Sequence, residues 1–166
     1  MKTIKLQLYI LLSLICISST SCGSDNENEK PSIIGEWTTI QRTVRTNYED
    51  VDKEINKYLA QDIEKNNLIR KFDEKQVTTS AISKETGKTT RRKTEYYELN
   101  NNILYIEDIS INAKTESIYT ISYKRLTTTR PIDETGLRVI LLEVGGYDPN
   151  QMPEDIKGEL TISEAR

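Results

Sequence analysis

From Leu68 onward, short stretches rich in β-branched and aromatic residues alternate with turn-forming residues at the spacing of β-hairpins. The turns are marked by Asp73-Glu74-Lys75, by Glu85-Thr86-Gly87-Lys88 and by Asn100-Asn101-Asn102, because Gly and Asn tolerate the positive φ angles of tight turns. Seven or eight antiparallel strands in this order favour a small closed or nearly closed barrel, or a sandwich. The expected strands are Thr38–Arg45, Leu68–Phe72, Gln76–Ser83, Lys88–Leu99, Ile103–Asp108, Ser117–Leu126, Gly136–Val144 and Leu160–Ile162.

Of these folds we expect a mainly β, antiparallel up-and-down barrel of about eight strands, because closure removes exposed strand edges. A barrel of this size has an interior that side chains fill or that holds one small ligand.

One segment interrupts the strand pattern. Between Tyr48 and Asn67, apolar residues recur every four positions, while Asp, Glu and Lys occupy the opposite face. This spacing predicts an amphipathic helix inserted after the first strand, with Asn47 or Asp50 capping its first turn. We expect its apolar stripe to pack on the barrel, since a membrane-surface helix would have a cationic polar face. The stripe consists of Val51, Ile55, Leu59 and Ile63, widened by Tyr58.

The first residues have the organisation of an export signal. Lys2 and Lys5 form a basic start, the apolar run from Leu6 to Ile17 follows, and the small residues Ser18 to Ser21 precede Cys22. The apolar run is too short to span a bilayer stably. Small residues before a cysteine are what a lipoprotein signal peptidase accepts, so we expect cleavage before Cys22 and lipid on its thiol.

Cleavage at this point removes Cys16 and leaves one thiol in the mature chain, which lipidation explains. The alternative is an ordinary secretory leader with an incidental cysteine. The chain is therefore divided into a signal peptide (1–21), a flexible acidic tether (22–32) and one folded domain (33–166). The acidic run from Ser24 to Glu27 resembles the signal that sends some Gram-negative lipoproteins to the outer face of the outer membrane, although a solvated linker has the same composition.

The charge balance argues against nucleic acid as a partner. The chain carries 23 basic and 26 acidic residues, and loss of the leader removes Lys2 and Lys5. Phosphate binding needs a concentrated positive face. The one basic cluster, Lys88 to Lys93, contains Arg91-Arg92-Lys93 and is typical of a solvated strand face.

The residues of common catalytic sites are missing. The chain has no histidine, which removes the commonest general base and the imidazole metal ligand. With Cys22 lipidated, no thiol nucleophile or thiolate metal site remains. The adjacent carboxylates Glu107-Asp108 and Glu154-Asp155 fit strand-end and turn positions, and no calcium-loop pattern is present. We therefore expect no enzymatic activity, no cofactor and no metal.

Several segments together resemble a known family. They are Ile34-Gly35-Glu36-Trp37, Tyr96 to Leu99, Asn101 to Ile106, Tyr119-Thr120-Ile121 and Leu137 to Leu142. In this combination the chain resembles the lipocalin-like domains of bacterial lipoproteins, which belong to the calycin-type β-barrels. The resemblance implies an up-and-down barrel over most of the mature chain.

In that family, the tryptophan after the glycine closes one end of the barrel, so Gly35 and Trp37 are expected to serve the fold. If the barrel has a pocket, we expect its lining among tyrosines at alternating strand positions, since Tyr combines apolar area with a polar tip. Packing in the core is the alternative for them. These candidate ligand-lining residues are Tyr97, Tyr105, Tyr119 and Tyr123.

The sequence thus predicts a non-enzymatic cell-envelope protein, held at the outer membrane by lipid and exposed on its periplasmic or its outer side. We expect its barrel to bind a small apolar or amphipathic molecule. The alternatives are an accessory subunit with a filled barrel that docks on an envelope protein, and an inhibitor or immunity lipoprotein. A core filled by Trp37, Tyr97, Ile121 and Leu141 would favour docking over ligand binding.

Overall fold

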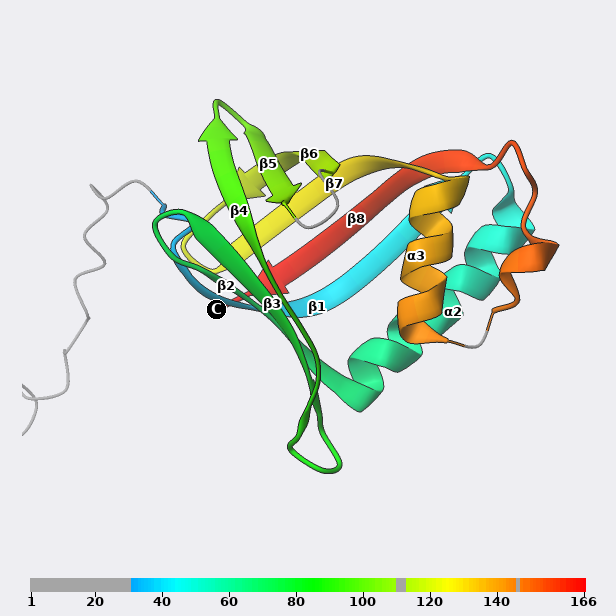
Figure 1. Cartoon of the computed structure of the whole chain (residues 1–166), viewed down its shortest axis with the longest axis horizontal. Coiled ribbons are helices and arrows are strands. Elements are labelled where there is room, and N and C mark those ends of the chain that lie inside the picture. Colours follow the sequence, from blue (N-terminus) through cyan, green and yellow to red (C-terminus); the bar gives the residue numbers. More distant parts are fainter. Residues whose placement is uncertain (1–30, 110–112, 146) are drawn as a thin grey trace, which may run out of the picture. The chain divides into compact units, whose positions relative to one another are not determined.

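The computed structural model describes residues 31–109, 113–145 and 147–166. Within them, eight antiparallel strands form a closed barrel, in which sequential strands pair and β1 also pairs with β8 (Figure 1). The prediction of a mainly β, up-and-down barrel is confirmed. The expected signal peptide, most of the tether and Cys22 lie outside the described residues. The strands are β1 (Gly35–Thr46), β2 (Asn66–Phe72), β3 (Gln76–Ser83), β4 (Thr89–Asn100), β5 (Ile103–Asp108), β6 (Ala113–Ile121), β7 (Arg125–Asp133) and β8 (Lys157–Ala165).

Two helices lie side by side at one end of the barrel (Figure 1). Helix α2 (Glu49–Lys65) follows β1, as predicted, and helix α3 (Glu134–Val144) connects β7 to β8. A short 3-10 turn, η1 (Pro149–Gln151), follows α3. Both helices therefore connect strands at the end of the barrel opposite the turn between β2 and β3.

Helix α2 packs on the barrel through the predicted apolar stripe. Ile55 and Leu59 have no exposed surface. The predicted capping residues are wrong, however, because Tyr48 takes the N-cap position and makes no side-chain cap hydrogen bond. Instead, the carboxylate of Asp52 accepts hydrogen bonds from the backbone N–H of Thr46 at 2.9 Å and from its hydroxyl at 2.6 Å. The helix is thus tied to the end of β1 from within its first turn.

The segment Gly136–Val144, predicted as a strand, is instead the helix α3. Its N-cap is Asp133, whose side chain accepts a hydrogen bond from the backbone N–H of Gly136 at 2.9 Å. Leu137, Ile140 and Leu141 face the core at helical spacing, whereas residues between them are exposed. A nearly continuous apolar run fits a buried strand and a buried helix equally well, and here the cap and the spacing decide for the helix.

The segment Ser117–Leu126, predicted as one strand, is a hairpin. Strand β6 ends at Ile121 and β7 begins at Arg125, and the backbone N–H of Ser122 donates to the carbonyl of Arg125 across the turn at 2.8 Å. The last strand also extends well beyond the predicted Leu160–Ile162. The predicted number of strands is therefore right, because one strand too many at α3 offset the strand missed here.

A β-bulge between Thr39 and Gln41 changes the faces of β1. The sequence places Ile40 on one face with Arg42 and Val44, yet Ile40 is 44% exposed, whereas Val44 is buried. The extra residue reverses the alternation, so Arg42 and Val44 point into the barrel together with Trp37 and Thr39 from before the bulge.

An apolar cluster closes the end of the barrel where β1 begins and β8 ends. Trp37 is fully buried there, at the kind of position that the resemblance implies for it, and its indole N–H donates to the carbonyl of Ile33 at 2.7 Å. The guanidinium of Arg166 lies 4.0 Å from the centre of the Trp37 ring. We call this the closed-end cluster: Ile33, Trp37, Phe72, Val77, Leu104 and Leu126.

A second apolar cluster joins the two helices to the other end of the barrel. Leu141 belongs to this cluster, so it does not share one core with Trp37, as a filled barrel favouring docking would have required. We call it the helix-side cluster: Val44, Ile55, Leu59, Ile132, Leu137, Ile140, Leu141, Tyr147, Met152, Ile156 and Leu160. The interior between the two clusters is not apolar.

Candidate functional site

Charged and hydroxyl side chains line the barrel between its two apolar clusters. On β7, Thr128 and Arg130 lie on the inward face between Leu126 of the closed-end cluster and Ile132 of the helix-side cluster. The same alternation on the other strands brings further charges inside. We call this set the interior polar band: Arg42, Asp62, Arg70, Arg91, Lys93, Glu95, Asp108, Thr128, Arg130 and Glu164.

Arg70 and Glu164 form a buried ion pair within this band. The Nε atom of Arg70 donates to Glu164 Oε1 at 2.7 Å, and its Nη2 donates to Glu164 Oε2 and, at 3.3 Å, to the hydroxyl of Thr128. Glu164 has no exposed surface. The pair links β2, β7 and β8 across the interior, and all of its charge is satisfied inside the protein.

Lys93 joins two carboxylates on neighbouring strands. Its Nζ lies 2.9 Å from Glu95 and 2.8 Å from Asp108. Partial burial disfavours the charged amine, but the hydrogen bonds to Asp108 and Glu95 outweigh it and raise the pKa of Lys93. This ammonium group is therefore committed to its two partners.

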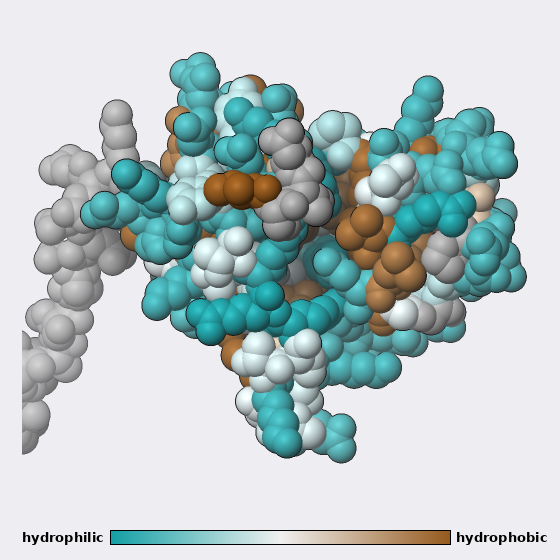
Figure 2. Space-filling model, in the orientation of Figure 1, coloured by the Kyte–Doolittle hydropathy of each residue, from teal (hydrophilic) through white to brown (hydrophobic). Residues whose placement is uncertain are grey.

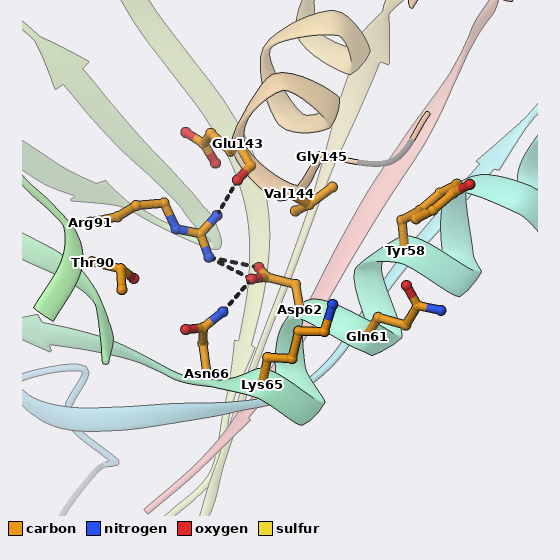
Figure 3. A pocket seen from close by; sticks show the side chains of 10 residues that line it. All are labelled: Tyr58, Gln61, Asp62, Lys65, Asn66, Thr90, Arg91, Glu143, Val144 and Gly145. Atoms are coloured by element: carbon orange, nitrogen blue, oxygen red, sulfur yellow. Dashed lines mark hydrogen bonds and ion pairs between the residues drawn. The ribbon is translucent and has the colours of Figure 1, made fainter. Parts of the chain in front are cut away.

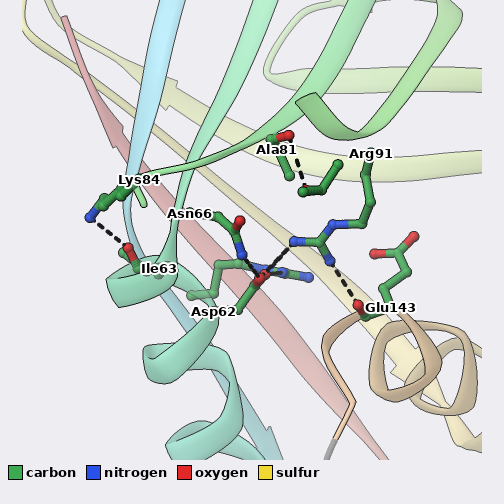
Figure 4. A network of polar contacts seen from close by, with 9 residues as sticks. Asp62, Ile63, Asn66, Ala81, Lys84, Arg91 and Glu143 are labelled. Atoms are coloured by element: carbon green, nitrogen blue, oxygen red, sulfur yellow. Dashed lines mark hydrogen bonds and ion pairs between the residues drawn. The ribbon is translucent and has the colours of Figure 1, made fainter. Parts of the chain in front are cut away.

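Asp62 gathers polar groups from three elements at the end of α2 (Figure 4). Its carboxylate accepts from Arg91 Nη2 at 2.6 and 2.9 Å, from Arg42 Nη1 at 3.4 Å and from Asn66 Nδ2 at 2.8 Å. Asp62 is buried, one helical turn after Leu59, so it continues the apolar stripe with a charge. A charged residue at a position of the apolar stripe was the sign in the sequence that Asp62 would be buried with polar partners, and the prediction from sequence missed it.

A pocket of about 410 Å³ opens beside the ion pair of Asp62 and Arg91 (Figure 3). Arg91 also donates from Nη1 to the backbone carbonyl of Glu143 at 3.0 Å, so one side chain of β4 contacts both helices. The pocket lies between α2, β4 and the end of α3, and its described lining is Tyr58, Gln61, Asp62, Lys65, Asn66, Thr90, Arg91, Glu143, Val144 and Gly145.

Two arginines of the band, Arg42 and Arg130, have a long ion-pair contact or none among the described residues. The Nε atom of Arg42 is buried and has no hydrogen-bond partner among the described residues. The guanidinium group of Arg130 makes no hydrogen bond or ion pair within the same residues, and the carboxylates of Glu95 and Glu143 act on it at longer range. Burial lowers the pKa of both guanidinium groups, and the charge of Arg130 lowers that of Arg42 further.

Two inward-facing side chains of β3 and β4 are exposed to solvent. Thr79 shares the inward face of β3 with Val77 and Ala81, which are buried, yet Thr79 itself is exposed. Its pairing partner on β4, Lys93, has a side chain that is 52% exposed. At this level of the barrel, inward-facing side chains therefore contact solvent, whereas the residues of the closed-end cluster are buried.

The four tyrosines proposed as ligand-lining residues do not lie together. Tyr97 and Tyr119 pack against the closed-end cluster, and their hydroxyl groups donate to the carbonyls of Asp73 at 2.5 Å and Asn101 at 3.1 Å. Tyr105 alternates with the inward-facing Leu104, and so faces outward, where Lys114 Nζ lies 4.3 Å from its ring centre. Tyr123 lies in the turn after β6 and is 49% exposed. Contact of any of them with a ligand stays a prediction.

Other kinds of site find no support among the described residues. None of their His, Cys, Asp and Glu side chains form a group of three or more that could hold a metal ion. Neither α2 nor α3 is long and apolar enough to cross a membrane, and the same holds for every helix of the described part. Comparisons with protein-family models, with curated proteins and with solved structures found no match for this chain.

Proposed function

We propose that this protein is a non-enzymatic, lipid-anchored protein of the cell envelope whose barrel binds a small amphipathic molecule. The observation that carries the proposal is the exposure of Thr79, an inward-facing residue between buried Val77 and Ala81. A barrel whose core were filled throughout would bury such a residue. From this exposure we infer that the interior offers room that a ligand can enter from solvent.

The chemistry around this opening suits a ligand with an apolar part and a polar part. Tyr97, Ile106, Tyr119 and Ile121 are only partly buried against the closed-end cluster, so apolar surface remains for an alkyl or aromatic group. The interior polar band begins directly beside it, since Ile106 is followed on its face of β5 by Asp108. A purely apolar ligand would displace water from those charged groups without offering them a polar contact, which is costly.

The cellular setting of the proposal depends on the N-terminal sequence. Lipid on Cys22 would hold the barrel at the outer membrane, with the acidic residues after it as a tether. The absence of histidine from the chain supports a binding role rather than catalysis. The closed barrel with Trp37 at its sealed end supports the proposed kinship with lipocalin-like domains.

Fluorescence titration with 11-(dansylamino)undecanoate tests the binding role. We expect saturable enhancement of dansyl emission with the protein. Thr79→Trp places a large ring in the opening and should weaken binding by about tenfold, equivalent to roughly 1.4 kcal/mol. Thr94→Trp, on the outward face of the neighbouring strand, serves as the matched control and should bind as the unchanged protein does. Equal binding by both variants would place the probe outside the barrel.

Docking onto an envelope protein is the second candidate function. Helix α3 exposes Val139 by 54% and Leu142 by 75%, and Figure 2 shows apolar surface gathered over this helix. Exposed apolar side chains that adjoin one another are typical of interaction surfaces. Leu142→Glu should reduce crosslinking to membrane proteins if α3 docks, and should leave dansyl-probe binding unchanged.

A further inference from the structure

We propose that the barrel interior contains an anion site in which Arg42 and Arg130 bind the carboxylate of a small organic acid. This inference rests on the proposed function, because it names the polar group of the amphipathic ligand that the barrel recognises. Three observations support this site: the pairing of the interior charges, the placement of the two arginines, and the hydrogen bond that Arg42 Nε leaves unmade.

The interior carboxylates are already engaged by other cations. Glu164 binds Arg70, and Lys93 binds both Glu95 and Asp108. The carboxylate of Asp62 receives two hydrogen bonds from Arg91 and only one, longer contact from Arg42. Arg42 therefore shares its one carboxylate partner, Asp62, with Arg91, which lies closer to it.

Arg130 has no ion-pair partner among the described residues. No carboxylate oxygen of the described part of the chain lies within ion-pair distance of its guanidinium group, although the residue is partly buried on the inward face of β7. Glu95, Glu143 and Asp133 act on it only at longer range. A partly desolvated guanidinium without a close anion is costly, unless a ligand supplies the missing charge.

The strand register brings the two arginines to one place. Arg42 on β1 pairs with Ile162 of β8, and Arg130 on β7 pairs with Leu160 of the same strand. Leu160 and Ile162 are neighbours on the inward face of β8, two residues apart. Arg42 and Arg130 therefore lie on either side of β8 at adjacent inward-facing positions. Burial is the main cause of the lowered pKa of Arg42, and the positive charges of Arg91 and Arg130 lower this pKa further. The like charges of Arg42 and Arg130 repel each other. An anion between them would relieve this repulsion.

The unpartnered atom indicates the kind of anion. Arg42 is buried to nine-tenths, with 10% of its side chain exposed, and its Nε–H lacks an acceptor. A guanidinium group presents its N–H donors in a planar fork that matches the two oxygens of a carboxylate. A carboxylate would accept from this N–H and would supply the counter-charge that Arg130 lacks.

The test compares two ligands with the same alkyl chain, decanoate and 1-decanol, by isothermal titration near pH 7. We expect decanoate to bind at least about tenfold more tightly than 1-decanol. Arg130→Gln should remove this preference, and Arg130→Lys, which keeps the charge but not the fork, should restore part of it. Arg45→Gln is the matched control, because Arg45 is exposed on β1. Arg42→Gln independently removes the second guanidinium group of the proposed site. Circular dichroism verifies that each variant is folded.

Each outcome decides one of the two proposals. Decanoate preference that both Arg130→Gln and Arg42→Gln abolish, and that Arg45→Gln leaves intact, supports the anion site. Equal binding of decanoate and 1-decanol overturns the anion site but leaves the amphipathic-ligand proposal standing. If neither ligand binds, the proposed function fails. Thermal unfolding in the presence of acetate then tests whether the anion site exists. A higher melting temperature in acetate than in equal chloride, seen in the unchanged protein but not in Arg130→Gln, supports the site, whereas no difference overturns it.

Discussion

At the scale of single residues, the buried ion pair of Arg70 and Glu164 has the largest expected effect on stability. Glu164→Leu leaves a desolvated guanidinium without its counter-charge, which costs on the order of 3–5 kcal/mol. Replacing both residues by Leu removes the unpaired charge and should cost much less. Urea unfolding of the two variants measures the difference. If the double variant were as unstable as Glu164→Leu, the pair would not be the source of the loss.

Asp73 stabilises the turn between β2 and β3 in a pH-dependent way. Its Oδ1 accepts from the backbone N–H groups of Lys75 at 3.0 Å and Gln76 at 2.7 Å, which lower the pKa of Asp73 below 3.8. Because the folded state has the lower pKa, this stabilisation is present above that value and is lost as the pH falls through the folded pKa. Asp73→Asn should therefore reduce the free energy of unfolding near pH 7, and the difference from the unchanged protein should shrink near pH 2. A constant difference at both pH values would contradict this account.

The inward-facing arginines were the hardest part of the molecule to predict from sequence. Arg42, Arg70 and Arg130 are ordinary polar residues in strands whose alternation alone would allow them to face solvent. Their inward direction depends on closure of the barrel and, for Arg42, on a bulge that no local residue pattern announces. Tyr97 and Tyr119 pack against the closed-end cluster, in line with core packing as the alternative that the sequence offered for them.

At the scale of the elements, α3 allows a matched comparison of two leucines on one helix. Leu137 is fully buried and Leu142 is 75% exposed. Leu137→Ala should cost about 2–5 kcal/mol, because it leaves a cavity in the helix-side cluster. Leu142→Ala should change the free energy of unfolding by less than about 0.5 kcal/mol. Chemical denaturation measures both, and equal losses would be inconsistent with this orientation of α3.

The elements differ in how much of their structure their sequences determine. Helix α2 was predicted because its charged and apolar residues separate onto two faces with a period that only a helix has. Helix α3 lacks such a contrast, since Val139 and Leu142 are apolar on its exposed face. The hairpin of β6 and β7 was missed because Ser122-Tyr123-Lys124 contains neither glycine nor asparagine to mark a turn.

At the scale of the whole molecule, barrel closure was predictable from the number and order of hairpins. Its interior was not, because closure fixes which face points inward without fixing whether that face is apolar. The two apolar clusters close the ends, and the interior polar band occupies the space between them. A chain of this kind buries enough apolar surface at its ends to accommodate charges at its centre.

Attachment to the membrane is a prediction about the whole protein in its cell. Cys22→Ala should abolish palmitate labelling and release the protein from the membrane fraction. The mutated residue lies outside the barrel sequence, so binding of the dansyl probe should persist. Membrane retention of the variant at its original level would exclude lipid on Cys22 as the anchor.

The binding of a carboxylate inside the barrel is tested most directly by NMR of the arginine Nε–H groups during titration with decanoate. We predict saturable shifts of the signals of Arg42 and Arg130, since the carboxylate accepts the hydrogen bond that Arg42 Nε lacks. The signals of the exposed Arg45 and Arg125 should remain unchanged. Shifts of equal size at all four arginines, or none at Arg42 and Arg130, would contradict a carboxylate site in the barrel.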